Sequence, residues 1–162
     1  MKKLRMVLMS TAIAASALVF TGCDKDDDND NNRPGTFELS GSASGSQAEP
    51  SNSSSGSANI SGTYDSTTNV MNYKIVWTNL STAPTTAGIF ARATGGGSDI
   101  GIGSAISLGS APAASSGEVS GTVTLSADDE VKLLANQAYY VVRTSTYANG
   151  EVRGNINTKA KN

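Results

Sequence analysis

Few side chains in this sequence can carry out chemistry. The 162 residues contain no histidine and a single cysteine, Cys23, and acidic residues form runs at 24–30 and 128–130. The absence of histidine excludes Ser–His–Asp triads, most proton transfer at neutral pH and the commonest transition-metal ligand. The acids at 128–130 fit the start of a helix, where they oppose its dipole. We therefore expect no enzymatic activity, no bound metal and no cofactor.

The position of Cys23 indicates export and lipid attachment. A basic start at 2–5 precedes an uncharged, mostly apolar stretch at 6–20, which is the order of a secretory signal peptide. The seventeen residues between Arg5 and Cys23 are fewer than the roughly 20 apolar residues of a membrane-spanning helix. The Thr-Gly-Cys ending resembles the lipobox of bacterial lipoproteins, although Phe20 departs from its usual aliphatic residue. We expect an outer-membrane or cell-surface lipoprotein, with a periplasm-facing anchor as the alternative.

Cleavage before Cys23 would remove the signal peptide at 1–22 and leave 140 residues. A single cysteine allows no intramolecular disulfide, and a lipidated one leaves no free thiol in an oxidising compartment. All 14 acidic residues but only nine of the 12 basic ones would remain, for a formal charge of −5. This balance argues against nucleic acid as a partner and against direct adhesion to anionic lipid. The lipid on Cys23 is therefore the expected contact with the membrane.

Residues 23–35 are expected to form a disordered tether, because the run DKDDDNDNN at 24–32 is too polar to join a core. An EF-hand calcium loop would need Gly and Glu where this run places Asn29 and Gly35, so a calcium site is excluded. Acidic runs after a lipidated cysteine resemble surface-export signals in some Gram-negative lineages, whereas in others an adjacent Asp retains the protein at the inner membrane. We expect surface export. The predicted sorting residues are Asp24, Asp26, Asp27, Asp28 and Asp30.

Alternating apolar residues, separated by Ser, Gly, Asn and Pro, predict short β-strands from residue 36 onward. A helix is expected between Ser126, which can cap it, and Asn136, which can end it in a left-handed conformation. Residues 36–158 thus predict one all-β domain, an antiparallel sandwich or barrel of about eight strands with one short helix. A tail follows at 159–162. The expected strands cover 37–39, 58–64, 71–77, 87–94, 100–108, 119–125, 139–146 and 151–158, with a Ser/Gly/Ala loop at 40–57.

Local patterns refine this picture. The polar turn at 65–69 predicts a hairpin, and the Asn-Gly pair at 149–150 predicts another between the last two strands. Trp77 shares its period-two register with other apolar residues, which indicates a core position. The glycines at 95–97 are a connecting loop rather than a phosphate cradle, because no lysine follows them and no helix begins there.

Four segments follow the order of one known family. Residues 47–50 read QAEP, 69–75 read NVMNYKI, 133–140 read LLANQAYY, and 149–156 read NGEVRGNI. The stretch 39–156 resembles the CHRD domain, the module named after chordin and found in many bacterial secreted proteins. The closing segment is the most specific, since it resembles the family's Gly-Glu-Ile-Arg-Gly-Gln-Ile at Glu151, Arg153 and Gly154. The resemblance implies an immunoglobulin-like sandwich.

The chain departs from this family at its histidines. Family members usually carry His-Ile-His on the middle strand and His-Thr before the last hairpin. Here the corresponding residues are Gly88, Ile89 and Phe90, and Arg143 followed by Thr144. A metal or catalytic role of those histidines therefore cannot be transferred to this chain. Because the family's biochemical role is poorly defined, the resemblance implies a module rather than an activity.

We accordingly expect a lipid-anchored, non-enzymatic module that is structural or binds an unknown protein or glycan. The alternatives are an atypical enzyme on the same sandwich and a carbohydrate-binding accessory module. A carbohydrate module usually stacks exposed aromatic rings on sugars, so aromatic exposure distinguishes the binding interpretations. Buried polar groups bonded to one another in a cleft would favour the enzyme.

Arg143 is the predicted focus of any remaining ligand site, together with Phe90. A two- or four-residue turn at the last hairpin would place Arg143 on the inward face with Tyr139, Val141, Val152, Gly154 and Ile156. Glu151, Arg153 and Asn155 would then face outward. A three- or five-residue loop would reverse this parity. A partly buried guanidinium needs partners, and the candidate carboxylates are Glu49, Asp99 and Glu118.

Overall fold

The computed structural model describes residues 35–92, 100–101 and 114–161. The predicted signal peptide, Cys23, the acidic run at 24–32, the glycines at 95–97, Asp99 and residues 102–108 of the strand predicted at 100–108 lie outside these residues. The described elements are β1 (Thr36–Ser44), the 3-10 helix η1 (Gly45–Gln47), β2 (Ser57–Asp65), β3 (Val70–Thr78), β4 (Pro84–Ala91), β5 (Ile100–Gly101), β6 (Gly117–Thr124), α1 (Ala127–Leu134), β7 (Ala138–Thr144), β8 (Val152–Asn155) and β9 (Asn157–Ala160).

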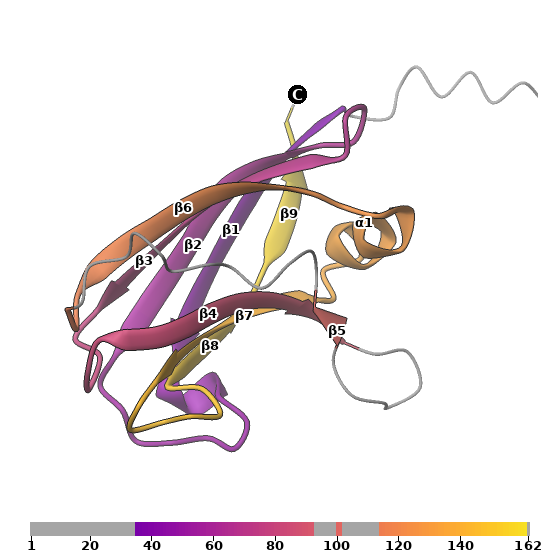
Figure 1. Ribbon diagram of the computed structural model, residues 1–162. Helices are drawn as coiled ribbons and strands as arrows, with labels where there is room; N and C mark the ends of the chain where they lie inside the picture. The colour runs from indigo at the N-terminus through magenta and orange to yellow at the C-terminus, as the bar shows by residue number, and fades with distance from the viewer. Residues whose placement is uncertain (1–34, 93–99, 102–113, 162) are drawn as a thin grey trace, which may run out of the picture. The chain divides into compact units, whose positions relative to one another are not determined.

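The strands of the described ranges form one curled antiparallel sheet in the order β5-β4-β7-β8-β1-β2-β3-β6. In Figure 1, β4, β7 and β8 lie as one layer beneath β1, β2, β3 and β6. β1 joins the layers, because β8 pairs with it at Ser44 and β9 pairs with it at 37–40. The predicted all-β, sandwich-like fold is confirmed. The largest fully buried side chains between the layers include Trp77, Tyr64, Tyr140, Met71 and Ile75.

Several local predictions are confirmed. β2 and β3 form the expected hairpin, and the Asp65 carboxylate accepts backbone N–H bonds within its turn. Ser126 caps α1 by accepting from the N–H of Asp129 at 3.2 Å, and Asn136 follows the helix with a φ of 56°. Trp77 is fully buried, as its strand register predicts. No helix in the described ranges is long and apolar enough to cross a membrane.

The structure also corrects two predicted boundaries. β1 continues to Ser44 through what the composition indicates is a loop, and its Leu39 and Ala43 point into the core. Gly41 permits this path, because a Cβ there would collide with the Asn155 carbonyl. The predicted tail at 159–162 is partly ordered, since β9 extends to Ala160 along β1.

Candidate functional site

The last hairpin positions the candidate site, and its register reverses the predicted faces. Val142 pairs with Val152, so the number of residues between these two partners is odd. A two- or four-residue turn, as predicted, would leave an even number of residues between the paired residues of the two strands. Tyr139, Val141 and Arg143 therefore lie on the outer face with Arg153, and the prediction that they face inward is wrong. The core face carries Tyr140, Val142, Val152 and Ile156, as expected for the last two.

Glu151 departs from the alternation of its strand. Its N–H donates to the Val142 carbonyl at 2.9 Å although Val142 pairs with Val152, so two consecutive residues oppose one, as in a β-bulge. The prediction that Glu151 faces outward is consequently wrong: its exposed fraction is 0%. Gly150, directly before it, has a φ of +139°, a conformation that side chains rarely adopt.

Four donors surround the Glu151 carboxylate. Oε1 accepts from the Ser54 hydroxyl and the Ser81 N–H, and Oε2 accepts from the Ser81 and Thr144 hydroxyls, each at 2.6 Å. Burial alone would raise the pKa of Glu151, but these hydrogen bonds outweigh burial and lower it. The carboxylate is thereby held ionised and joins three separate segments of the chain, which indicates a structural role.

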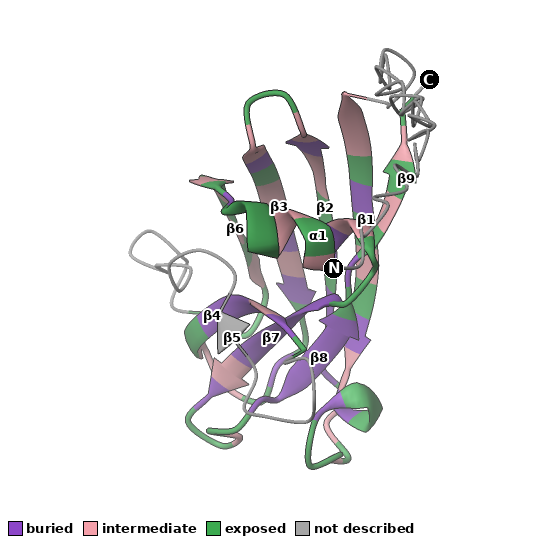
Figure 2. Ribbon diagram, turned by 90° about the vertical axis from the view of Figure 1, so that its right-hand side faces the viewer, coloured by how far each residue is buried: buried purple, intermediate pink, exposed green. Residues whose placement is uncertain are grey.

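The first and last of the four family-like segments meet at this hairpin. Asn52 donates through Nδ2 to the carbonyls of Gly150 and Glu151, at 3.2 and 3.1 Å. The Gln47 side-chain amide lies beside the carbonyls of Ser42 and Arg153, and these two acceptors assign its nitrogen to that side. The segment after β1 thus covers the outer face of β8, and Figure 2 shows β7 and β8 buried along most of their length.

Arg153 faces outward as predicted, but it is buried there. Its side chain is only 7% exposed and forms an ion pair with Glu49, whose side chain is 66% exposed. The guanidinium carbon lies 3.9 Å from the centre of the Tyr139 ring. Arg92 approaches the other Glu49 oxygen at 3.8 Å, so this carboxylate is shared by two arginines. The family-like Gly154 lies beneath, where a Cβ would collide with the Ser42 carbonyl.

Arg143 lies at the other end of the same face. Its guanidinium carbon is 5.1 Å from the centre of the Phe90 ring, and Phe90 stacks on Tyr139 at 5.6 Å. The Phe90 ring lies over Gly88, where a Cβ would come within 2.6 Å of it. The residues at the three family histidine positions, Gly88, Phe90 and Arg143, therefore form one packed unit.

The prediction that Arg143 is partly buried is confirmed, but two of its predicted partners, Glu49 and Glu118, pair with other residues, and the third, Asp99, lies outside the described residues. Glu49 pairs with Arg153 and Arg92, and Glu118 pairs with Lys74. Among the residues that the structure describes, no carboxylate lies within ion-pair distance of Arg143. Its observed partner is the aromatic face of Phe90.

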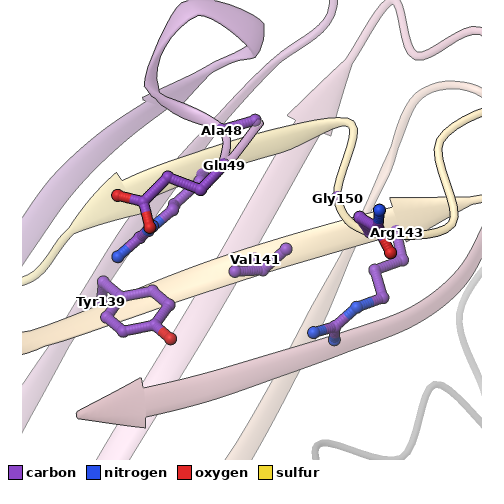
Figure 3. Close-up of a pocket in the computed structure, with 8 residues that line it drawn as sticks. Ala48, Glu49, Tyr139, Val141, Arg143 and Gly150 are labelled. Carbon is purple, nitrogen blue, oxygen red and sulfur yellow. The ribbon is translucent and has the colours of Figure 1, made fainter. Parts of the chain in front are cut away.

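Arg143 and Arg153 both line a hollow of about 130 Å³, and Figure 3 shows Arg143 with other residues that line it. The Arg143 side chain extends along β7 toward Tyr139, with Val141 between them, and Glu49 faces them from the segment after β1. We call this hollow the outer pocket. Its lining residues are Ala48, Glu49, Tyr139, Val141, Arg143, Asn149, Gly150 and Arg153.

The outer pocket offers groups that bind rather than react. Two guanidiniums and the Asn149 amide can donate hydrogen bonds, and its one carboxylate, Glu49, is already paired with arginine. No serine, threonine, lysine or cysteine lines it. Within the described part of the chain, no three acidic, histidine or cysteine side chains converge as metal ligands.

Sequence reasoning identified Arg143, Arg153, Phe90 and Glu49 but missed the burial of Glu151 and the pairing of Glu49 with Arg153. The signal that could have found these features was the resemblance of the segments at 47–50 and 149–156 to one family. No curated protein and no solved structure matches the chain. The family described as the CHRD domain matches residues 37–156, which is most of the chain and confirms the predicted resemblance. This chain therefore belongs to the CHRD domain family.

Proposed function

We propose that this chain is a lipid-anchored, non-enzymatic module that presents the outer pocket to a ligand at the outer membrane or cell surface. The observation that carries the proposal is the pocket itself, which combines two arginines and an amide with a carboxylate that is already paired with arginine. Membership of the CHRD family supports a β-sandwich module of non-enzymatic type. The lipid on Cys23 would hold the domain at the membrane, and the acidic tether would direct its export.

An enzymatic function is not favoured, although the structure contains a cluster of buried polar groups bonded to one another. Each oxygen of the Glu151 carboxylate already accepts two hydrogen bonds, which leaves it little capacity for a substrate. Its lowered pKa also makes it a weak base at neutral pH. Glu151 is moreover fully buried and does not line the outer pocket.

A carbohydrate module that works by aromatic stacking is not favoured either. Trp77, Tyr64 and Tyr140 are fully buried, and Tyr139 is 4% exposed beneath Arg153. None of the aromatic side chains in the described ranges belongs to the exposed class, and the Phe90 face is covered by Arg143. At the outer pocket, hydrogen bonds and charge are therefore the expected means of recognition.

The test is capture of ligand from the native envelope with the lipidated protein as bait. The wild type, Arg143→Gln and a matched control, Lys74→Gln, would be compared at equal loading. Lys74 is exposed on β3, pairs with Glu118 and does not line the outer pocket, so its loss leaves the pocket intact. We expect the captured material to be lost from Arg143→Gln alone. Equal capture by all three proteins would contradict binding through the outer pocket.

A further inference from the structure

We propose that the outer pocket binds the carboxylate of an acidic sugar, a hexuronate residue of an envelope polysaccharide. This inference rests on the proposed function and specifies its ligand class. It starts from Arg143, the one arginine of this face with no carboxylate partner in the described part of the chain.

Arg143 is held ready for a planar anion. The guanidinium carbon of Arg143 lies over the Phe90 ring, 5.1 Å from its centre, and a cation–π contact leaves the N–H groups able to donate to another partner. Those groups form a fork that matches both oxygens of a carboxylate. The packing of Phe90 over Gly88 and against Tyr139 fixes the ring and thereby restrains the guanidinium.

The local charge favours a monoanion. Arg143 and Arg153 line the outer pocket together with a single acid, Glu49, which Arg153 already neutralises. The described side chains that line the outer pocket thus carry a net charge of +1, and Arg143 is the one of its two arginines without a carboxylate partner among the described residues. A carboxylate carries one negative charge and balances it, whereas a phosphate monoester approaches two at neutral pH.

The remaining lining groups favour a sugar as the carrier of this carboxylate. Asn149 can donate and accept hydrogen bonds, and Glu49 can accept them, beside the arginine fork. A hexuronate has hydroxyls next to its carboxylate that suit these groups. The acid of a peptide side chain follows an apolar stem, so it brings no hydroxyls beside the carboxylate for Asn149 and Glu49.

A second hollow indicates an extended ligand. It measures about 190 Å³, is lined by Gln47, Arg92, Gly154 and Asn155, and shares Arg153 with the outer pocket. The outer pocket alone has room for one end group or one sugar ring, since its volume is about 130 Å³. Both hollows together present Arg143 and Arg92 on either side of Arg153, so an acidic oligosaccharide can contact more than one cation.

The experiment titrates the lipidated full chain in detergent with a trisaccharide of galacturonate, using calorimetry. The comparison ligands are galacturonate itself, a neutral galactose trisaccharide, inorganic phosphate and a triglutamate peptide. We expect the acidic trisaccharide to bind most tightly and the neutral one not to bind. Arg143→Gln should weaken binding by roughly ten- to one-hundredfold, as the loss of a charged hydrogen-bonding fork predicts. Lys74→Gln should bind as the wild type does.

Arg92→Gln separates the two hollows. It should weaken binding of the trisaccharide but not of the monosaccharide, because Arg92 lines only the second hollow. Unchanged melting temperatures would show that each variant is folded.

The hexuronate inference is overturned if the trisaccharide does not bind, if Arg143→Gln binds it equally well, or if phosphate or triglutamate binds as tightly. Should envelope capture still depend on Arg143 in any of these cases, the proposed function stands and only the ligand class is wrong. Capture that is independent of Arg143 contradicts the proposed function itself.

Discussion

Replacing Glu151 with glutamine removes one buried charge and keeps the shape of the side chain. The four donors around it form 2.6 Å bonds, and bonds to a charged group contribute about 1.5–3 kcal/mol each against about 0.5–1.5 for neutral ones. The amide would keep one oxygen acceptor, and the Ser81 and Thr144 hydroxyls would turn to accept from its nitrogen. Each of the four bonds would weaken by about 1 kcal/mol. The lower cost of burying a neutral group would offset part of this loss, so we expect the free energy of unfolding at pH 7 to fall by about 2–4 kcal/mol.

The same substitution should change the response to acid. Hydrogen bonding holds the pKa of Glu151 below its ordinary value of 4.5 in the folded chain despite burial. Because the pKa of Glu151 is lower in the folded chain than in the unfolded chain, its ionised carboxylate stabilises the fold at pH values above the unfolded pKa. This stabilisation is lost as the pH falls through the pKa of the folded chain. The wild type should therefore lose stability more steeply than Glu151→Gln below about pH 5, and the difference between the two should narrow.

Urea unfolding between pH 3 and 7, followed by the fluorescence of Trp77, measures both effects. Trp77 is the only tryptophan of the chain and is fully buried, so it reports loss of the core. The matched control is Glu118→Gln, whose carboxylate is exposed on β6 and pairs with Lys74; we expect a change below about 1 kcal/mol. A Glu151→Gln protein as stable as the wild type at pH 7, or a difference between them that does not vary with pH, would refute the reasoning.

Four further predictions concern the anchor, the tether, the closing segment and metals. Cys23→Ala should abolish processing and leave the precursor in the inner membrane, whereas intact mass of the wild type from membranes should show removal of residues 1–22 and an acylated cysteine. Alanine at the five aspartates of 24–30 should leave the melting temperature nearly unchanged yet reduce cleavage by protease added to whole cells; equal cleavage would contradict a sorting role. Gly154→Ala should cost about 3 kcal/mol in chemical unfolding, because its Cβ would collide with the Ser42 carbonyl. The purified protein should contain no stoichiometric zinc, copper or iron by elemental analysis, since Gly88, Phe90 and Arg143 stand at the family histidine positions; about one ion per chain would refute this.

The predictions that succeeded depend on near neighbours in the chain. The hairpin from β2 to β3 follows from its alternation and its Asp65 turn, and the limits of α1 follow from the Ser126 cap and the left-handed Asn136. Such features are set by hydrogen bonds and backbone conformations within a few residues, which sequence patterns describe directly.

The register of the last hairpin could not be predicted from neighbouring residues in the sequence. The Asn-Gly pair correctly predicts a connection between β7 and β8, yet it does not determine how many residues of the connection remain unpaired between the two strands. A change of one residue moves every side chain of a strand to the opposite face, so one wrong loop length misplaced Arg143 together with Tyr139 and Val141. The bulge at Glu151 added a second departure, because it turns that side chain away from the face that it shares with Arg153 by alternation.

By itself, the sequence determined the fold class, the family, the lack of histidine chemistry and the importance of the closing segment. Only the tertiary structure decided what that segment does. Glu151 is buried because Ser54 and Ser81, 97 and 70 residues away, supply its donors. Arg153 is buried because Glu49 and Tyr139 enclose it. The sequence alone does not distinguish a charged side chain that water solvates from one that polar groups distant in the chain stabilise. Only the folded chain brings those groups next to the charge.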